Sequence, residues 1–318
     1  MSTTECGVSC AVFGSLGLVF IVMLIRWVNI HFLVIGSSFK ASDYRKAGTD
    51  GPVWAIVTGC TSGIGEGFVL ELIKRGFAVL MFSRSAEKLK SLSTSLQLAN
   101  PQATIAYAAI DFSQKEIVPL VSKAATGKDI AVLVNNVGAS LEFPKDISDN
   151  TAAEIEEMIA VNVRATTILS HWAVEKISQR DPIHGKRGAI LNVSSLFGSL
   201  GSPMLAVYSG TKSFIDSFSL SIATELRRRG ISVFCCTPGY VVSNMSKLKR
   251  TSFTVIDGAT CARNALDQAG LGIVSAAPHW THSLIRVGLL MLPEWFRCAK
   301  ILEFHEKIHK RALSKRMR

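Results

Sequence analysis

The sequence predicts an α/β fold in which helices cover both faces of a parallel sheet. Between residues 53 and 237, short apolar runs rich in β-branched residues alternate with helical stretches. Strands buried on both faces have this continuous apolar character, and parallel strands need crossover helices. Composition agrees, because 48% of the 318 residues are hydrophobic and 19% are charged, which excludes a disordered chain. Seven cysteines are too few for a disulfide-stapled scaffold.

Six strands and five helices are expected in strict alternation. The strands are predicted at Val53–Thr58, Ala78–Ser83, Thr104–Ala109, Ile130–Asn135, Ala189–Ser194 and Ser232–Thr237. The helices are predicted at Ile64–Arg75, Ala86–Leu98, Gln114–Ala125, Glu154–Gln179 and Tyr208–Arg229. This order is the pattern of a doubly wound sheet.

The N-terminal segment is predicted to be a membrane anchor. Gly7–Ile25 is a run of 19 residues without a charge, and a helix of this length nearly crosses a hydrocarbon core of about 30 Å. A cleaved signal peptide is the alternative, but it needs a basic start, and only Glu5 precedes the run. Lys40, Arg45 and Lys46 follow the run instead, so the positive-inside rule places the rest of the chain in the cytosol.

These observations divide the chain into four parts. We expect an anchor over residues 1–36, a linker over 37–52, the α/β domain over 53–275, and a final segment over 276–318. The paired thiols Cys235 and Cys236 share one predicted strand, which favours reduced packing residues in a cytosolic domain.

Positive charge is concentrated at the C-terminus. The chain has a formal charge of +11 and a mean hydropathy of +0.31, an unusual pairing for a freely soluble protein. Residues 297–318 contain eight basic and two acidic side chains, a net of +6. They form either a solvated helical tail or a basic helical tail near anionic lipid, where each basic residue contributes about 1 kcal/mol. A membrane partner is expected and nucleic acid is not, because few aromatic residues interleave these charges.

A glycine-rich turn follows the first predicted strand. The stretch Thr58-Gly-Cys-Thr-Ser-Gly-Ile-Gly65 runs directly into a helix. Glycines at such a turn let backbone N–H groups approach a phosphate at the positive end of the helix, as in a Rossmann-type dinucleotide site. A tight connection without a ligand is the alternative. The residues assigned to cofactor binding here are Gly59, Ser62, Gly63, Ile64 and Gly65.

The end of the second predicted strand favours NADP over NAD. Ser83-Arg84-Ser85 offers no carboxylate for the 2′-hydroxyl of NAD, whereas the guanidinium of Arg84 can pair with the 2′-phosphate of NADP. A solvated surface arginine is the alternative. The predicted cofactor is therefore NADPH.

Further motifs resemble the short-chain dehydrogenase/reductase family. The glycine turn is followed in the family's order by Asn135-Asn-Val-Gly138, Asn162, Ser195, Tyr208-Xaa3-Lys212 and Pro238-Gly239. The resemblance implies an oxidoreductase whose catalytic residues are Asn162, Ser195, Tyr208 and Lys212. It also implies cofactor contacts by Asp111, Asn136, Gly138, Tyr208, Lys212 and Pro238. Asn135 is expected to tie strands together, and a helix N-cap is the alternative role for Asp111.

The spacing of Tyr208 and Lys212 suggests proton transfer. Residues four apart share one face of a helix. A phenol with a pKa of about 10 is a poor acid–base group at neutral pH, and a neighbouring ammonium lowers that pKa. Ser195 follows a predicted strand and can donate a hydrogen bond to a substrate carbonyl. The resemblance implies that Lys212 also holds the nicotinamide ribose, and that Asn162 anchors a water that relays protons to Lys212.

No metal site is predicted. The histidines lack ligand-like spacing with carboxylates or cysteines, and we interpret them as structural or surface residues. The ones considered are His171, His184, His279 and His282.

The flanking segments resemble one microsomal branch of the family, the very-long-chain 3-oxoacyl-CoA reductases and 17β-hydroxysteroid dehydrogenases. They are Pro238–Val255, Pro278–Ile285 and the N-terminal anchor, and Val137 recurs in that branch. The resemblance implies NADPH-dependent reduction of a long-chain 3-oxoacyl-CoA to the 3-hydroxyacyl-CoA in fatty-acid elongation. It implies a place in the endoplasmic reticulum membrane, with elongase subunits as partners. The alternatives are reduction of steroid ketones, and a membrane scaffold that binds nucleotide without catalysis.

Two further segments bear on the substrate. Lys247, Lys249 and Arg250 suit a polyanionic CoA. Leu284–Pro293 could line an acyl path, contact the bilayer, or form a core strand and helix, but it is too short to span a membrane. The chain ends Lys315-Arg-Met-Arg318, whereas members of the branch can end in a dilysine retrieval signal. Retention is therefore expected to depend on the anchor or on partner subunits.

Overall fold

The protein is described by a computed structural model that covers residues 21, 22, 24, 25, 27, 28, 30, 31, 39–45 and 51–316. It divides into two compact units, Met1–Ser37 and Ser38–Arg318. The described residues of the first unit are helical. Among the helices in the described ranges, none is long and apolar enough to cross a bilayer. The anchor expected over residues 1–36 lies largely outside the described residues and stays a prediction.

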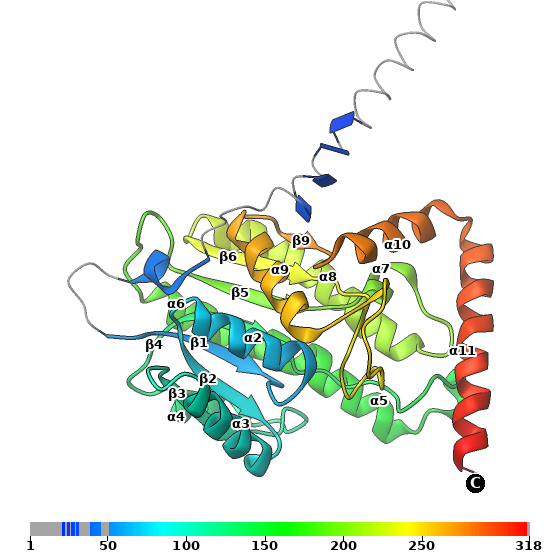
Figure 1. Ribbon diagram of the computed structural model, residues 1–318, viewed down its shortest axis with the longest axis horizontal. Helices are drawn as coiled ribbons and strands as arrows, with labels where there is room; N and C mark the ends of the chain where they lie inside the picture. Colours follow the sequence, from blue (N-terminus) through cyan, green and yellow to red (C-terminus); the bar gives the residue numbers. More distant parts are fainter. Residues whose placement is uncertain are drawn as a thin grey trace, which may run out of the picture. The chain divides into compact units, whose positions relative to one another are not determined.

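The second unit is built on a seven-stranded parallel sheet with the order β3-β2-β1-β4-β5-β6-β9 (Figure 1). The strands are β1 Val53–Thr58, β2 Ala78–Ser83, β3 Ile105–Ala109, β4 Asp129–Asn135, β5 Gly188–Val193, β6 Ile231–Cys236 and β9 Ser275–Ala276. The six predicted strands are confirmed to within one residue at each end. The seventh, β9, was missed because two residues paired with the end of β6 leave no readable pattern. A separate ribbon pairs β7 Tyr240–Val241 with β8 Val255–Ile256.

The five predicted helices are present, one of them with an irregular segment. They are α2 Gly63–Lys74, α3 Ala86–Ala99, α4 Ile117–Ala125, α5 Ala152–Met158, η3 Ile159–Ala165, α6 Thr166–Ser178, α7 Leu196–Leu200, α8 Ala206–Arg227 and α9 Gly258–Gly270, with short 3-10 turns η1 Ala41–Tyr44 and η2 Ile147–Asp149. The helices α7 and α9 were not predicted. The single helix expected over Glu154–Gln179 is interrupted by η3, a π-helical segment. Because η3 lies directly between α5 and α6, one continuous helical stretch covers all three, and the π-helical segment was not predicted.

The main core lies between the sheet and the helices α4, α6 and α8. Alternate residues of β1, Trp54 and Ile56, pack in one cluster with Leu169 and Trp172 of α6 and Leu226 of α8. Burial of such side chains is the main force that holds the layers together.

Helices α2 and α9 cross in close backbone contact. A Cβ atom on Gly67 would collide with the carbonyl oxygen of Gly258, and a Cβ atom on Gly258 would collide with that of Gly63. Only glycine permits this approach, which holds the start of α2 against α9.

The folded body begins inside the segment expected to be a linker. Phe39 and Tyr44 are buried, with ring centroids 5.9 and 6.1 Å from that of Phe77. The backbone N–H of Ala41 donates to the Arg75 carbonyl at 3.0 Å, and Arg180 Nη2 donates to the Tyr44 carbonyl at 2.6 Å. Residues 39–45 are therefore packed into the second unit.

Two helices end the chain, α10 Trp280–Met291 and α11 Glu294–Arg316 (Figure 1). The expected basic helical tail is confirmed as α11. The alternative of a core strand at Leu284–Pro293 is wrong, because most of this stretch is the second half of α10. Imidazole Nδ1 atoms tie α11 to two loops: His305 lies 2.7 Å from the Pro203 carbonyl oxygen, and His309 lies 2.7 Å from that of Pro144.

Candidate active site

The predicted site residues gather at the carboxyl edge of the sheet. The glycine turn follows β1, Asn136 follows β4, Ser195 follows β5 and Pro238 follows β6. The strand order changes direction between β1 and β4, because β2 and β3 lie on one side and β5 and β6 on the other. Open α/β sheets bind their ligands at such a switch point.

The glycine turn is shaped by contacts that exclude side chains. Gly59 has φ +64°, and a Cβ atom there would lie 2.8 Å from Val137 Cα. A Cβ atom on Gly65 would collide with the Gly59 carbonyl oxygen. Ser62 is the N-cap residue of α2, yet its side chain makes no capping hydrogen bond. The start of α2 thus keeps the uncapped N–H groups and the partial positive charge that suit a phosphate.

Thr58 and Asn136 hold this turn against β4. The Thr58 hydroxyl accepts from the N–H groups of Asn136 and Val137, both at 3.0 Å. Asn136 Nδ2 donates to the carbonyl oxygens of Thr58 and Gly59 at 2.9 and 3.0 Å. Asn136 therefore positions the turn, and its expected cofactor contact stays a prediction. Asn135 ties strands as expected, since its Nδ2 donates to Asn192 Oδ1 of β5 at 2.9 Å.

Arg84 and Asp111 follow β2 and β3 at the same edge. Arg84 is 70% exposed, and its Nη1 lies 3.3 Å from Glu157 Oε1. Asp111 Oδ1 accepts from the backbone N–H and the hydroxyl of Ser113 at 2.9 and 2.8 Å, and these bonds lower the pKa of its carboxyl. The alternative of a helix N-cap at Asp111 is wrong, because α4 is preceded by Glu116.

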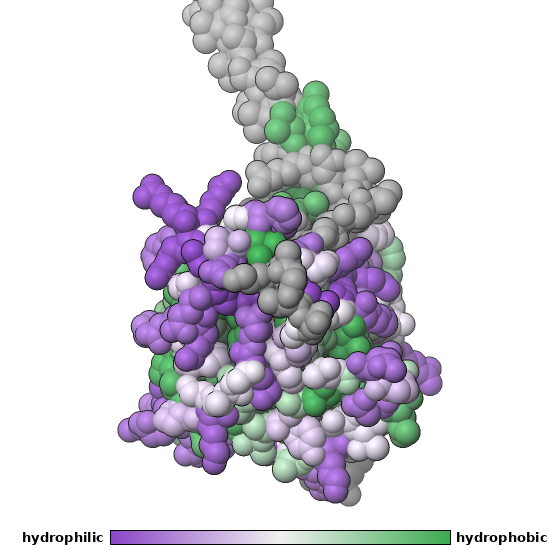
Figure 2. All heavy atoms as spheres, turned by 90° about the vertical axis from the view of Figure 1, so that its left-hand side faces the viewer, coloured by the Kyte–Doolittle hydropathy of each residue, from purple (hydrophilic) through white to green (hydrophobic). Residues whose placement is uncertain are grey.

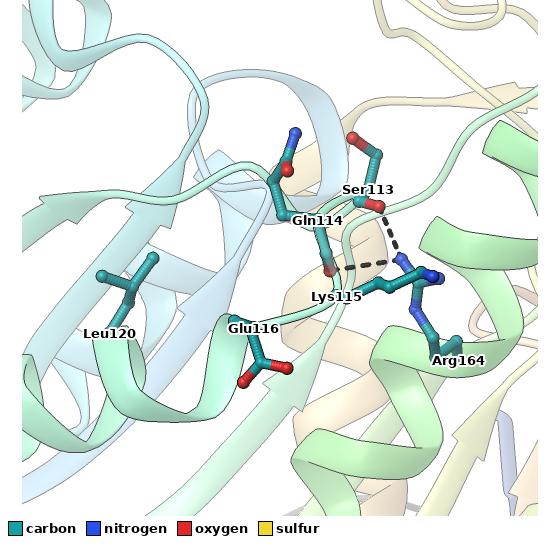
Figure 3. Close-up of a pocket in the computed structure, with 6 residues that line it drawn as sticks. All are labelled: Ser113, Gln114, Lys115, Glu116, Leu120 and Arg164. Carbon is teal, nitrogen blue, oxygen red and sulfur yellow. Dashed lines mark hydrogen bonds between the residues drawn. The ribbon is translucent and has the colours of Figure 1, made fainter.

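A shallow pocket of about 580 Å³ lies beside Asp111, outside the group of predicted catalytic residues (Figure 3). In it Arg164 reaches from η3 and donates to the carbonyl oxygens of Ser113 and Gln114. The guanidinium thereby fixes the loop after β3 to the π-helical segment.

Lys212 is buried beside the Tyr208 ring. Its Nζ lies 5.8 Å from the centroid of that ring and donates to the Val193 carbonyl oxygen at 2.9 Å. Burial lowers the pKa of Lys212 to about 8, although the neighbouring Cys235 and Asp216 act in the opposite direction. Tyr208 and Lys212 therefore lie together on α8 as predicted. The lowered pKa means that the Lys212 ammonium loses its proton more readily than that of an ordinary lysine.

The Tyr208 phenol is held neutral by its surroundings. Burial raises its pKa, and the hydrogen bond with the Ser195 side chain opposes this rise without cancelling it. The net direction is thus opposite to the lowering expected from Lys212, because desolvation by burial is the largest influence on the Tyr208 pKa. The Ser195 hydroxyl also accepts from the N–H of Phe197 at 3.3 Å.

Asn162 lies in η3 and is fully buried. Its Oδ1 accepts from the Ala139 N–H at 2.7 Å, and its Nδ2 donates to the Ala139 carbonyl at 2.9 Å and to the Thr211 hydroxyl at 2.9 Å. A Cβ atom on Gly138 would lie 3.4 Å from Asn162 Oδ1 and 3.5 Å from Lys212 Nζ. Gly138 therefore leaves open the space next to both groups, and the π-helix brings Asn162 to it, as such segments often do at functional sites.

A carboxylate behind Lys212 was missed by the sequence analysis. Asp216 follows Lys212 by four residues on α8, and the Cys235 thiol donates to its Oδ1 at 3.4 Å. Burial raises the pKa of Asp216, while Arg286 and Lys212 oppose this rise. The spacing Tyr208, Lys212, Asp216 along one helix face was the available signal.

Aromatic rings from the C-terminal helix reach the Ser195 side of the site. The Phe197 ring lies 6.3 Å from Tyr240 and 5.7 Å from His305, and Tyr240 lies 6.4 Å from Phe304. Of the basic residues expected to suit CoA, Lys249 and Arg250 are exposed and Lys247 Nζ lies 3.3 Å from Glu142 Oε1.

Comparisons with known proteins agree with this geometry. The family described as short chain dehydrogenase matches residues 53–252. The very-long-chain 3-oxoacyl-CoA reductase of Laccaria bicolor is 33% identical over 86% of this chain and 82% of its own. The rat (Rattus norvegicus) protein of the same name is 33% identical over 82% of each chain. A solved 7beta-hydroxysteroid dehydrogenase shares the fold with a TM-score of 0.70 and 22% identity, over 83% of this chain and 98% of that one. The chain belongs to the short-chain dehydrogenase family and is an oxidoreductase.

Proposed function

We propose that the protein reduces a long-chain 3-oxoacyl-CoA to the 3-hydroxyacyl-CoA with NADPH. The observation that carries the proposal is the grouping of Ser195, Tyr208 and Lys212 beside the glycine turn. The substrate class is supported by relatives of about one-third identity that bear the name very-long-chain 3-oxoacyl-CoA reductase.

The residues present fit a nicotinamide dinucleotide. Gly59, Gly63 and Gly65 keep side chains out of the turn, and the uncapped start of α2 would hold the pyrophosphate. The Thr237 hydroxyl, buried at the end of β6 before Pro238, is without a hydrogen-bond partner among the described residues, and it adds a polar atom at the same edge. When bound, the dinucleotide supplies the hydride.

Arg84 is the basis for proposing NADPH rather than NADH. Its largely exposed guanidinium follows β2, where it would pair with a 2′-phosphate after exchanging its contact with Glu157. We propose that Asp111 contacts the adenine of the cofactor.

Residues of the protein itself would transfer a proton to the ketone oxygen. Ser195 donates a hydrogen bond to the ketone oxygen, and Tyr208 delivers its phenolic proton to that oxygen as negative charge develops there. The raised pKa of Tyr208 keeps the phenol protonated at neutral pH, which is the state that a reduction needs. The Lys212 ammonium then stabilises the phenolate, and Asn162 holds the backbone at Ala139 next to Lys212.

We further propose that the protein works at the endoplasmic reticulum membrane, anchored through residues 1–36, with the catalytic unit in the cytosol and elongase subunits as partners. The support is the uncharged N-terminal run, the basic residues that follow it and the similarity to very-long-chain reductases.

The test is consumption of NADPH by the detergent-solubilised full chain. We expect turnover with a long-chain 3-oxoacyl-CoA, a much lower rate with NADH, and little with a 17-ketosteroid. Preference for the steroid would replace the substrate assignment while leaving the catalytic residues in place. Absence of turnover with any ketone would overturn the enzyme mechanism.

A further inference from the structure

The most exposed residues of α10 are all non-polar, whereas Ser283 and Arg286 are half-buried. The exposed residues of this helix are Leu284, Val287, Gly288, Leu290 and Met291. A helix on the surface of a soluble domain normally turns polar residues outward. Helix α10 therefore presents an outward face that resembles the inside of a protein.

Trp295, at the start of α11, is the first large exposed apolar side chain after Met291 along the sequence. Leu284, Val287 and Met291 are three and four residues apart, so they share one side of the helix. Met291 is 77% exposed, and Trp295, at the start of α11, is 74% exposed. We call Leu284, Val287, Leu290, Met291 and Trp295 the α10 surface.

The one charged residue of α10 is on the inner side. Arg286 is half-buried and acts on Asp216 of α8, whose pKa it lowers. No acidic residue occurs between Asp267 and Glu294. By contrast, the face of the molecule in Figure 2 shows mainly hydrophilic side chains with smaller hydrophobic areas between them.

We propose that the α10 surface lies in the interfacial layer of a bilayer with anionic headgroups, as a second membrane contact in addition to the predicted anchor. The inference goes beyond the proposed reductase activity and does not depend on it. Exposed apolar surfaces of this kind mark protein or membrane contacts, and three features favour lipid over a second copy of the chain.

The first feature is the short distance along the sequence between the second unit and the predicted membrane anchor. Phe39 is already buried in the body, so only a few residues separate the body from the segment predicted to cross the membrane. The second is Trp295, because tryptophan favours the boundary between headgroups and acyl chains. The third is charge, since residues 297–318, which follow the α10 surface directly, have a net charge of +6.

The experiment uses the full chain reconstituted in vesicles of phosphatidylcholine and phosphatidylserine, with and without bromine atoms on the acyl chains. Bromine quenches tryptophan fluorescence only at short range, and an interfacial helix buries its apolar face by about 5–10 Å. We expect brominated lipid to quench the Trp295 component, obtained as the difference between the wild type and Trp295→Phe, by at least about twofold at that depth.

Leu98→Trp is the matched control, because Leu98 on α3 is 78% exposed but lies outside the α10 surface. Its added fluorescence should be unaffected by brominated lipid. The double variant Leu284→Glu with Met291→Glu should lose most of the Trp295 quenching while its circular dichroism stays unchanged.

Equal quenching of wild type and Trp295→Phe would overturn the proposal, as would persistent Trp295 quenching in the double variant. Chemical cross-linking of detergent-solubilised chains tests the alternative that a second copy of the chain covers the α10 surface. Dimers that form in the wild type and disappear in the double variant, with Trp295 unquenched in vesicles, would assign the surface to a second copy instead.

Discussion

The Nζ of Lys212 donates to the Val193 carbonyl oxygen at 2.9 Å, so the cation on α8 is fixed to the last residue of β5. Ser195 follows Val193 by two residues. One hydrogen bond thereby sets the position of the ammonium relative to the serine hydroxyl and the Tyr208 ring. Val193 and Lys212 belong to a strand and a helix, and Ser195 is the N-cap residue of α7, so regular elements position these groups.

The first prediction concerns alkaline pH. The pKa of Lys212 is lowered to about 8, so its ammonium is lost above that pH instead of near 10.5. If the ammonium is required, kcat/KM should fall about tenfold per pH unit above this value. Initial rates across the range check this, with circular dichroism to show that the chain stays folded. A flat profile from pH 8 to pH 10.5 would show that the charge on Lys212 is dispensable.

The second prediction assigns a positioning role to Asp216. Its negative charge raises the pKa of Lys212, so Asp216→Asn should lower that pKa and move the alkaline limb to lower pH. The maximal rate should change little. Glu225→Gln removes an exposed carboxylate from the same helix and should leave the profile in place. An unchanged limb in Asp216→Asn would refute the coupling.

The third prediction concerns acid stability. His282 is buried, its Nδ1 accepts from the Gly239 N–H at 3.1 Å and its Nε2 lies 3.2 Å from the Thr254 carbonyl oxygen, which fixes a neutral imidazole. Burial lowers the pKa of His282 to about 4. The unfolded chain therefore binds more protons between pH 6.5 and pH 4, and the free energy of unfolding falls as pH drops through this window, by up to about 3 kcal/mol.

Denaturant unfolding in detergent at neutral and acidic pH measures this loss. His282→Gln cannot titrate, so its stability should depend less on pH than that of the wild type. An identical pH dependence in both proteins would place the acid sensitivity elsewhere.

The fourth prediction concerns cofactor choice. Arg84→Ala should raise the KM for NADPH by roughly ten- to a hundredfold, the size expected for one charge-assisted pair, and leave the KM for NADH unchanged. Lys88→Ala, at an exposed position on the next helix, is the control. Equal effects on both cofactors would show that Arg84 does not contact a 2′-phosphate.

Much of the fold was readable because its signals are local. Apolar β-branched runs such as Val53–Thr58 mark buried parallel strands, and the glycine turn marks the first crossover. The strand β9 was missed because it is defined by its pairing with β6, a relation that does not exist within the two-residue segment itself. The helix α9 was missed although it has local signals, since Asp257 caps its start and Cys261, Ala265 and Ala269 are buried at helical spacing.

In the candidate active site, too, local spacing could be read from the sequence and long-range contacts could not. The spacing of Tyr208 and Lys212 predicted their proximity, since a helix fixes it. The direction of the Tyr208 pKa was not predictable, because burial by the surrounding chain decides it. Nor could the sequence show that the Asn136 amide is used on the backbone of Thr58 and Gly59.

The most direct test of the mechanism is the turnover of Tyr208→Phe with NADPH and a long-chain 3-oxoacyl-CoA. This change removes one hydroxyl and keeps the ring beside Lys212. We expect the dissociation constant for NADPH to stay within about threefold of wild type, and kcat to fall by at least about a hundredfold, the usual contribution of a positioned general acid. A variant that binds NADPH and retains wild-type turnover would contradict the assignment of Tyr208 as the proton donor.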